Sequence, residues 1–121
     1  MKKQILIIED QLSTRKLLSH FLSNYYQVIE TEDATEALTL LSNGFKPDVI
    51  VSDLIMPGTS GLEFLKQMKD LEFETIPVMM LSGVENSHEK MKCFNLGAKD
   101  YMVKPFNPAE LQVRLSNMIA N

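Results

Sequence analysis

The stretch DVIVSDLIMPGTSG, residues 48–61, combines an apolar run, an acid and a loop rich in glycine and proline. Its first half is a short apolar run that ends on a carboxylate, Asp53. Its second half reads as a loop, because it contains Pro57, Gly58 and Gly61. A charge at the end of a buried strand is costly unless another group compensates it. The stretch therefore predicts a buried strand whose terminal carboxylate meets compensating groups from elsewhere in the chain.

The length and composition indicate a single globular domain. The 121 residues are 45% hydrophobic and 23% charged, which is an ordinary balance for a folded domain. We expect one domain over residues 1–121. No apolar run approaches the roughly 20 residues that span a bilayer, so we expect a cytoplasmic protein that makes no membrane contact. The net charge is -4 and no basic cluster is present, which argues against nucleic-acid binding by this domain.

Five short apolar runs recur along the chain and predict strands. Each is rich in Ile, Val, Leu or Met and is more continuous than alternating, which is typical of strands covered on both faces. The predicted strands are residues 4–8, 27–30, 48–52, 76–81 and 101–103.

The segments between these runs have helical spacing. Two apolar stripes are clear, one made of Leu17, Leu18, Phe21 and Leu22 and the other of Ala34, Ala37, Leu38 and Leu41. Four capping boxes mark helix starts: Asp33 with Glu36, Ser60 with Glu63, Asn86 with Glu89, and Asn107 with Glu110. Gly44 and Gly97 stand where the second and fourth helices should end.

Strands that alternate with helices predict a doubly wound α/β fold with a parallel sheet. For five strands the common order is 2-1-3-4-5, as in flavodoxin-like folds. In that order the first and third strands are neighbours, and ligands bind outside their carboxyl ends. Asp53 therefore lies at the predicted binding edge.

Several polar residues follow the predicted strands and converge on that edge. Glu9 and Asp10 follow the first strand, Asp53 the third, Ser82 the fourth and Lys104 the fifth. Carboxylates this close repel one another unless a cation lies among them. Taken singly, each of these residues would be an ordinary loop, cap or surface residue. Their joint placement on one edge is what indicates a site.

Mg²⁺ fits such a site because it prefers oxygen ligands, takes one or two carboxylates and keeps water positions that a phosphate can replace. We expect Asp10 and Asp53 as direct ligands, with the Ile55 backbone carbonyl beside them and Glu9 acting directly or through water. Lys104 would supply a fixed cation, and Ser82 a hydroxyl donor. Metal, ammonium and hydroxyl around one carboxylate suit phosphoryl transfer onto it, with Asp53 as the nucleophile.

These residues resemble the receiver domain of two-component response regulators. The resemblance lies in IIED (7–10), DLIMPGTSG (53–61) and GAKDYMVKPF (97–106), and it extends over the chain from Ile5 to Met118. It implies a (βα)5 receiver fold and a phosphoacceptor signalling domain, not a metabolic enzyme. It also implies that Asp53 takes a phosphoryl group from a histidine kinase or a histidine phosphotransfer protein with Mg²⁺ bound, and that the Lys104-Pro105 peptide bond is cis.

The resemblance further implies a switch and a contact face. Ser82 would move toward the phosphoryl group and Tyr101 would turn inward, which remodels the face made by the fourth helix, fifth strand and fifth helix. Lys90, Asp100, Glu110 and Arg114 resemble the charged set through which receivers of transcription regulators dimerise. Glu110 and Arg114 are four residues apart and could pair within one helix, whereas spacing gives Lys90 and Asp100 no such local partner.

Three other functions compete with this one, and the residues argue against each of them. A phosphatase of the haloacid-dehalogenase type needs a second acid two residues after the nucleophile, where Ile55 stands. A flavodoxin-like cofactor binder needs a phosphate-binding loop after the first strand, where acids stand instead. A receiver-like interaction module without phosphorylation would lack some of the site residues, and all of them are present.

Overall fold

A computed structural model describes residues 2–83 and 86–119 of the chain. Five strands and five helices alternate in it. The strands are β1 (Gln4–Ile8), β2 (Gln27–Thr31), β3 (Val49–Asp53), β4 (Val78–Ser82) and β5 (Asp100–Val103). The helices are α1 (Leu12–Leu22), α2 (Ala34–Ser42), α3 (Gly61–Asp70), α4 (Ser87–Asn95) and α5 (Pro108–Ile119). The strands form one parallel sheet in the order β2-β1-β3-β4-β5, which confirms the predicted fold class and order.

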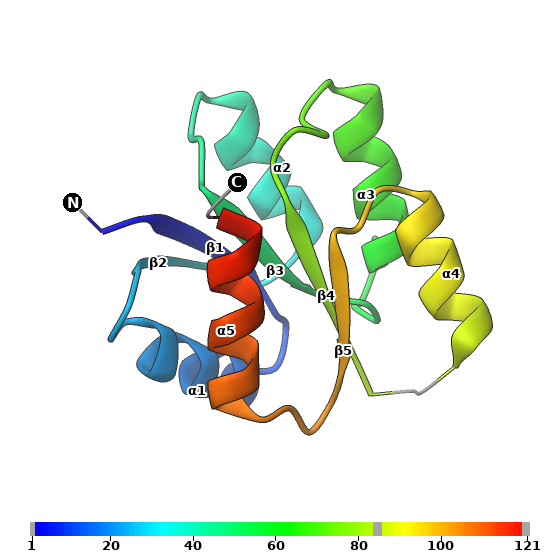
Figure 1. Cartoon of the computed structure of the whole chain (residues 1–121). Helices are drawn as coiled ribbons and strands as arrows, with labels where there is room; N and C mark the ends of the chain where they lie inside the picture. The colour runs from blue at the N-terminus through cyan, green and yellow to red at the C-terminus, as the bar shows by residue number, and fades with distance from the viewer. Residues whose placement is uncertain (1, 84–85, 120–121) are drawn as a thin grey trace.

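Helices cover both faces of the sheet, with α1 and α5 on one side and α2, α3 and α4 on the other (Figure 1). Successive residues of β1 alternate between the two layers: Ile5 and Ile7 pack with α1 and α5, whereas Leu6 and Ile8 pack with α2 and α3. A strand that faces two apolar layers needs apolar residues at every position. This is why the strands read as continuous apolar runs.

The third and fourth strands are displaced toward their carboxyl ends relative to the prediction. Val49–Asp53 replaces the predicted 48–52, and Val78–Ser82 replaces 76–81. Asp53 and Ser82 are therefore the last residues of their strands, paired in register with Leu81 and Val103. Backbone hydrogen bonds of the sheet thus hold both residues in place.

All four predicted helix caps are present. The side chains of Asp33, Ser60, Asn86 and Asn107 each accept a hydrogen bond from the backbone N–H three residues later. One apolar stripe differs from the prediction: Leu17 is 61% exposed, and the buried residues of α1 are Arg15, Leu18 and Leu22. The helix is rotated so that an arginine, and not Leu17, faces the sheet.

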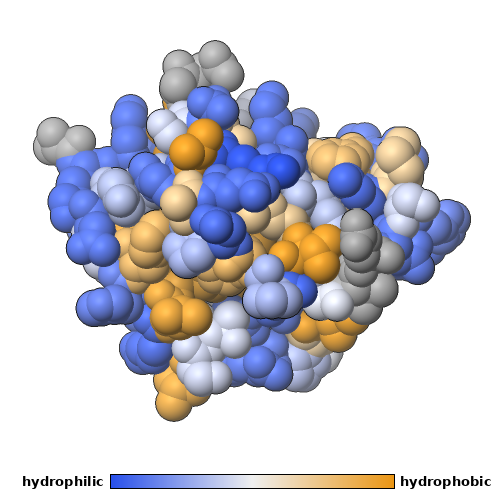
Figure 2. Space-filling model, turned by 60° about the horizontal axis from the view of Figure 1, so that its bottom comes forward, coloured by the Kyte–Doolittle hydropathy of each residue, from blue (hydrophilic) through white to orange (hydrophobic). Residues whose placement is uncertain are grey.

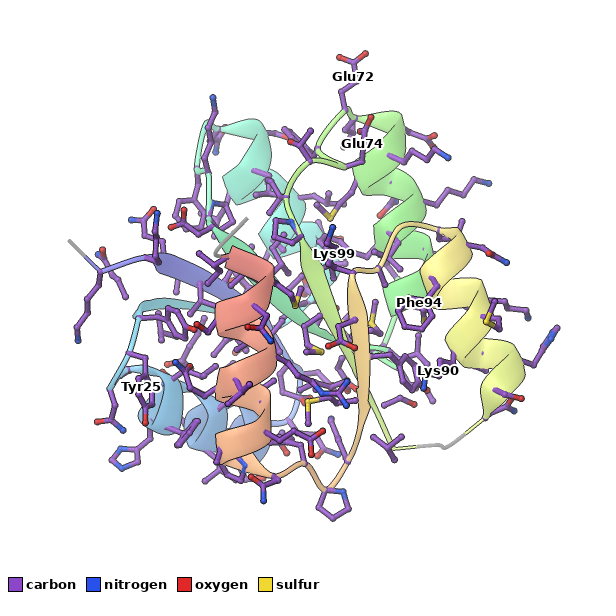
Figure 3. All side chains as sticks on the ribbon, in the orientation of Figure 1. Tyr25, Glu72, Glu74, Lys90, Phe94 and Lys99 are labelled. Carbon is purple, nitrogen blue, oxygen red and sulfur yellow. The ribbon has the colours of Figure 1, made fainter. Side chains whose placement is uncertain are left out.

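Three helices end in the same hydrogen-bonded turn, and one of the turns lacks glycine. Gly44 after α2 and Gly97 after α4 have φ of 99° and 108°, as expected. Glu72 after α3 has φ of 63°, with its N–H bonded to the Lys69 carbonyl and the Phe73 N–H bonded to the Met68 carbonyl. Its side chain points into solvent (Figure 3). A side chain in this left-handed conformation costs free energy that glycine avoids.

Glu72→Gly is therefore expected to raise the free energy of unfolding by about 0.5–1 kcal/mol. Glycine removes the strain of the left-handed conformation, and this gain exceeds the entropic cost of the more flexible unfolded chain. Urea unfolding followed by circular dichroism measures the change. Glu74→Gly is the matched control, since Glu74 is an exposed neighbour without a positive φ and should lose stability. An equal loss in both variants would contradict the prediction.

Candidate functional site

The polar residues predicted to form a site meet at the carboxyl ends of β1, β3 and β5. This end lies at the bottom of Figure 1 and is turned forward in Figure 2, where hydrophobic residues appear in separate patches among hydrophilic ones. Glu9 is 1% exposed and Asp53 is 9% exposed, whereas Asp10 is open to solvent. Oxygen atoms of these three carboxylates lie within 4.8 Å of one another.

Such an acidic cluster suits a hard divalent cation. Its donors are all carboxylate oxygens, which are the ligands of Mg²⁺ and Ca²⁺ more than of softer metals. The cluster opens into a pocket of about 600 Å³ whose wall includes Asp10, Asp53, Ile55, Gly83 and Lys104. The donor chemistry and the open wall fit Mg²⁺ together with a phosphoryl-sized group.

Lys104 reaches into the cluster from the end of β5. Its Nζ lies 2.8 Å from Glu9 Oε1 and 3.2 Å from Asp53 Oδ1. Burial alone would lower the pKa of the Lys104 ammonium, but the hydrogen bond to Glu9 and the charge of Asp53 raise it above its usual value. Lys104 therefore stays charged at neutral pH and offsets part of the carboxylate repulsion.

Glu9 is the most deeply buried acid of the cluster. Burial raises the pKa of its carboxyl, while hydrogen bonds from Lys104 and from the backbone of Gln11 act in the opposite direction. Glu9 Oε2 accepts the Gln11 N–H at 3.2 Å, and Oε1 faces Lys104. Both of its oxygens thus have a donor, but burial outweighs these hydrogen bonds and leaves the pKa of the Glu9 carboxyl above its usual value.

Backbone hydrogen bonds of the loop after β3 hold Asp53 in position. The Leu54 N–H donates to the Leu81 carbonyl at 2.8 Å, and the Gly61 N–H donates to the Leu54 carbonyl at 2.7 Å. A Cβ on Gly61 would lie 2.8 Å from the Asp53 carbonyl oxygen and 2.9 Å from Met80 Sδ. The close approach of α3 to the end of β3 therefore requires glycine at this position.

Ser82 lies beside the acidic pocket and not in its wall. It is 1% exposed and lines a neighbouring pocket of about 300 Å³ with Leu54, Ile55 and Leu62. The Lys104 N–H donates to the Ser82 carbonyl at 2.7 Å, and the Lys104-Pro105 bond is cis, which confirms that prediction. The structure thus places the Lys104 backbone next to Ser82 and its side chain on Asp53.

Tyr101 is 4% exposed and packs into the layer that contains α4. The Nζ of Lys90 lies 6.0 Å from the centre of its ring, and Figure 3 shows Lys90 on the side of α4 toward β5. Ile55 is 67% exposed, and it lines both the acidic pocket and the neighbouring pocket that contains Ser82. The two predicted switch residues, Ser82 and Tyr101, are thus both buried in this structure.

The charged face contains an ion pair that residue spacing does not show. Asp100 does have a partner in its own chain, because Arg114 Nη1 lies 2.9 Å from Asp100 Oδ1. Arg114 Nη2 also lies 3.0 Å from Glu110 Oε2, one turn away on α5. Residue spacing could not reveal the first pair, because it depends on how α5 packs beside β5. Of the four predicted face residues, three are joined within the chain.

Arg15 is a further residue at this end of the sheet, and the sequence reasoning missed it. Its Nη1 donates to the backbone carbonyl of Glu9 at 2.9 Å. The signal was present, since Arg15 precedes Leu18 and Leu22 by three and seven residues and therefore lies on their face of α1. An arginine in phase with an apolar stripe indicates a buried, paired charge.

Comparison with known proteins gives a consistent result. The family described as response regulator receiver domain matches residues 5–116. The phosphate regulon transcriptional regulatory protein PhoB of Escherichia coli K12 is 35% identical over 117 residues, which are 95% of this chain and 51% of that protein. The chain thus spans about half the length of the curated relatives it matches.

Two solved structures are similar over nearly their whole length. Chemotaxis protein CheY4 of Vibrio cholerae superposes with a TM-score of 0.88 at 32% identity, covering 98% of this chain and 99% of that one. A putative response regulator from Chloroflexus aurantiacus gives a TM-score of 0.93 at 29% identity, with both chains covered completely. Within residues 2–83 and 86–119, no helix combines the length and the hydrophobicity needed to cross a bilayer.

Proposed function

The chain belongs to the response regulator receiver domain family of two-component signalling, and on that premise we propose that Asp53 is its phosphoacceptor. The observation that carries this proposal is the position of Asp53 between an ammonium at 3.2 Å and two further carboxylates. The donor would be the phosphohistidine of a histidine kinase or of a histidine phosphotransfer protein, because receivers accept phosphoryl groups from histidine.

In the proposed transfer, an oxygen of Asp53 forms a bond to phosphorus while the bond from phosphorus to the histidine nitrogen breaks. The electron pair of that bond returns to the imidazole, and the product is an aspartyl phosphate. Lys104 already faces Asp53 and would pair with a phosphoryl oxygen after transfer. Ser82 and the backbone of Gly83 would donate to the other oxygens from the end of β4.

Mg²⁺ would be held by Asp10 and Asp53, by the Ile55 carbonyl, and by Glu9 directly or through water. When bound, it would supply positive charge next to the phosphoryl oxygens. Gln11 does not add a further acid, so the cluster keeps three carboxylates and one ammonium. The net negative charge of the cluster is what makes a divalent cation favourable there.

Phosphoryl uptake tests the proposal directly. The chain is incubated with acetyl phosphate with and without MgCl₂, and the mass of the intact protein is then measured. We expect a magnesium-dependent gain of one phosphoryl group, located by borohydride trapping and peptide mapping to Asp53. Uptake that does not depend on magnesium, or no uptake at all, would contradict the proposed function.

Lys104→Ala is expected to strengthen Mg²⁺ binding by about tenfold, or about 1.4 kcal/mol, because it removes an ammonium that competes for Glu9 and Asp53. Phosphoryl uptake should nevertheless fall, because the partner of the transferred group is lost. Isothermal titration calorimetry gives the affinity. Lys99→Ala is the control, since exposed Lys99 lies at the opposite end of β5. Weaker Mg²⁺ binding in Lys104→Ala than in Lys99→Ala would contradict this prediction.

The output face is proposed to be the groove between α4, β5 and α5. This groove has a volume of about 420 Å³, and its wall includes Lys90, Tyr101, Glu110 and Arg114. We propose that phosphorylation draws Ser82 toward the phosphoryl group and makes the buried position of Tyr101 the preferred one. Fluorine NMR of 3-fluorotyrosine at Tyr101, with and without beryllofluoride, would detect the change, and an unmoved resonance would refute it.

We further propose that this face dimerises on phosphorylation, with Lys90 facing Glu110 and Asp100 facing Arg114 of a second copy. Because Arg114 already pairs with Asp100 and Glu110, a dimer would exchange these pairs and gain little from charge alone. Beryllofluoride should raise the sedimentation coefficient of the wild type and of Lys66→Glu, an exposed control on α3, but not of Arg114→Glu. A dimer indifferent to Arg114→Glu would refute the contact.

A further inference from the structure

Arg15 places a positive charge in the layer between α1 and the sheet. The residue is 7% exposed and shares its helix face with Leu18 and Leu22. A guanidinium carries five N–H donors and cannot lose its charge, so burying it costs free energy unless both the donors and the charge are matched. The groups that match it therefore show what the side chain does.

The guanidinium bridges two kinds of partner. Nη1 donates to the backbone carbonyl of Glu9 at 2.9 Å and approaches that of Asp10 at 3.5 Å. Nε lies 3.3 Å from Glu30 Oε1, and Nη2 lies 3.5 Å from Glu32 Oε1. The carboxylates match the charge, while the carbonyls belong to the two acidic residues that follow β1.

These contacts hold the backbone of Glu9 through both of its polar groups. Its N–H donates to the Thr31 carbonyl at 3.1 Å, and its carbonyl accepts from Arg15. Glu30, at the end of β2, in turn anchors the guanidinium. The turn between β1 and α1 is thereby fixed to α1 and to β2, although its acidic side chains face the site.

The acidic cluster needs such an anchor. Carboxylates within 4.8 Å repel one another, and Asp10 is exposed and could turn outward into water. The direction of the Asp10 Cα–Cβ bond, from which its carboxylate extends, depends on the backbone dihedrals on either side of the Glu9 carbonyl. Fixing that carbonyl therefore keeps Asp10 near Asp53 when no cation balances their charges.

We propose that Arg15 is a positioning residue that preorganises the Asp10 carboxylate for Mg²⁺ by holding the backbone carbonyls of Glu9 and Asp10. This inference rests on the proposed function, because it takes the acidic cluster as the magnesium site. When a group that orients a metal ligand without itself binding the metal is removed, the metal affinity typically falls by roughly 10- to 100-fold.

Magnesium titration of Arg15→Gln by calorimetry tests the proposal. We expect the affinity for MgCl₂ to fall by roughly 10- to 100-fold, because Gln cannot bridge the carbonyls and the carboxylates. Lys16→Gln is the matched control: Lys16 is the next residue of α1 and also pairs with Glu30 at 3.0 Å, but it is exposed. Among the described residues, its ammonium has no ion pair with Glu9 or Asp10. Its affinity should equal that of the wild type.

A second measurement separates positioning from a loss of stability. In backbone NMR spectra recorded without magnesium, the amides of Asp10 and Gln11 should shift or broaden in Arg15→Gln and not in Lys16→Gln. Met118→Ala, a core variant at the opposite end of the sheet, should lose stability without a change in Mg²⁺ affinity. If Arg15→Gln fails to fold, Arg15→Lys replaces it, because lysine keeps the charge but lacks the forked donors.

The outcomes distinguish the inference from the function it rests on. Wild-type affinity in folded Arg15→Gln or Arg15→Lys, with unchanged Asp10 and Gln11 amides, would overturn the role of Arg15 and leave the magnesium site intact. A wild-type chain that binds no Mg²⁺ at millimolar concentration would overturn both. Loss of affinity confined to the Arg15 variants would support the proposal.

Discussion

Asp53→Asn is expected to reduce phosphoryl uptake from acetyl phosphate to background while the fold persists. Asparagine has nearly the same shape, so it fits at the end of β3, but its neutral amide is a poor nucleophile and a weaker magnesium ligand. Lys104 would keep Glu9 as its partner at 2.8 Å, which preserves the buried charge pair. The variant should therefore unfold cooperatively in urea with a midpoint near that of the wild type.

The measurement is the mass of the intact protein after incubation with acetyl phosphate and MgCl₂. Asp70→Asn makes the same chemical change on an exposed residue at the end of α3 and should take up phosphoryl groups at the wild-type rate. Continued labelling of Asp53→Asn, with the label mapped to another residue, would show that the phosphoacceptor has been assigned wrongly.

Gly61→Ala is expected to lower the free energy of unfolding by about 1–3 kcal/mol, the range of an overpacked core. Its new Cβ would lie 2.8 Å from the Asp53 carbonyl oxygen and 2.9 Å from Leu54 Cα, and these backbone atoms cannot move independently of the sheet. Since proteins of this size are stable by only about 5–15 kcal/mol, the loss is a substantial part of the total.

The same substitution should slow phosphoryl uptake, because the Asp53 peptide has to shift to make room for the methyl group. Urea unfolding and the uptake rate are measured on the same preparation. Gly83→Ala serves as the stability control, because a Cβ there meets no atom of residues 2–83 and 86–119 within 4 Å and the backbone φ is not positive. Equal stability of Gly61→Ala and Gly83→Ala would show that the loop relaxes freely around residue 61.

The strands and the helix starts could be predicted because their signals are local, and the strand order because it is the common one for a five-stranded doubly wound sheet. A strand buried on both faces needs an apolar residue at nearly every position, and a helix cap needs its residue at a fixed spacing. The convergence of Glu9, Asp10, Asp53 and Lys104 followed from topology, since the carboxyl ends of parallel strands share one edge.

The remaining features depend on packing between elements that are distant in the chain. The rotation of α1 buries Arg15 and exposes Leu17; the spacing to Leu18 and Leu22 indicates that Arg15 is buried, but it does not show its partner Glu30 on β2. The pair between Asp100 and Arg114 depends on the placement of α5 beside β5. The left-handed turn at Glu72 could not be predicted, because it lacks the glycine that usually marks such a turn in a sequence.

The confinement of the acidic cluster to one end of the sheet has a consequence for protein engineering. The turns at the opposite end, such as the one at Glu72 between α3 and β4, carry helix-ending hydrogen bonds and none of the proposed site residues. Fluorophores, affinity handles or inserted reporter domains can therefore be attached at that end without touching the chemistry. For sensor design, the domain thus offers one end that carries the acidic cluster and another end for attachment.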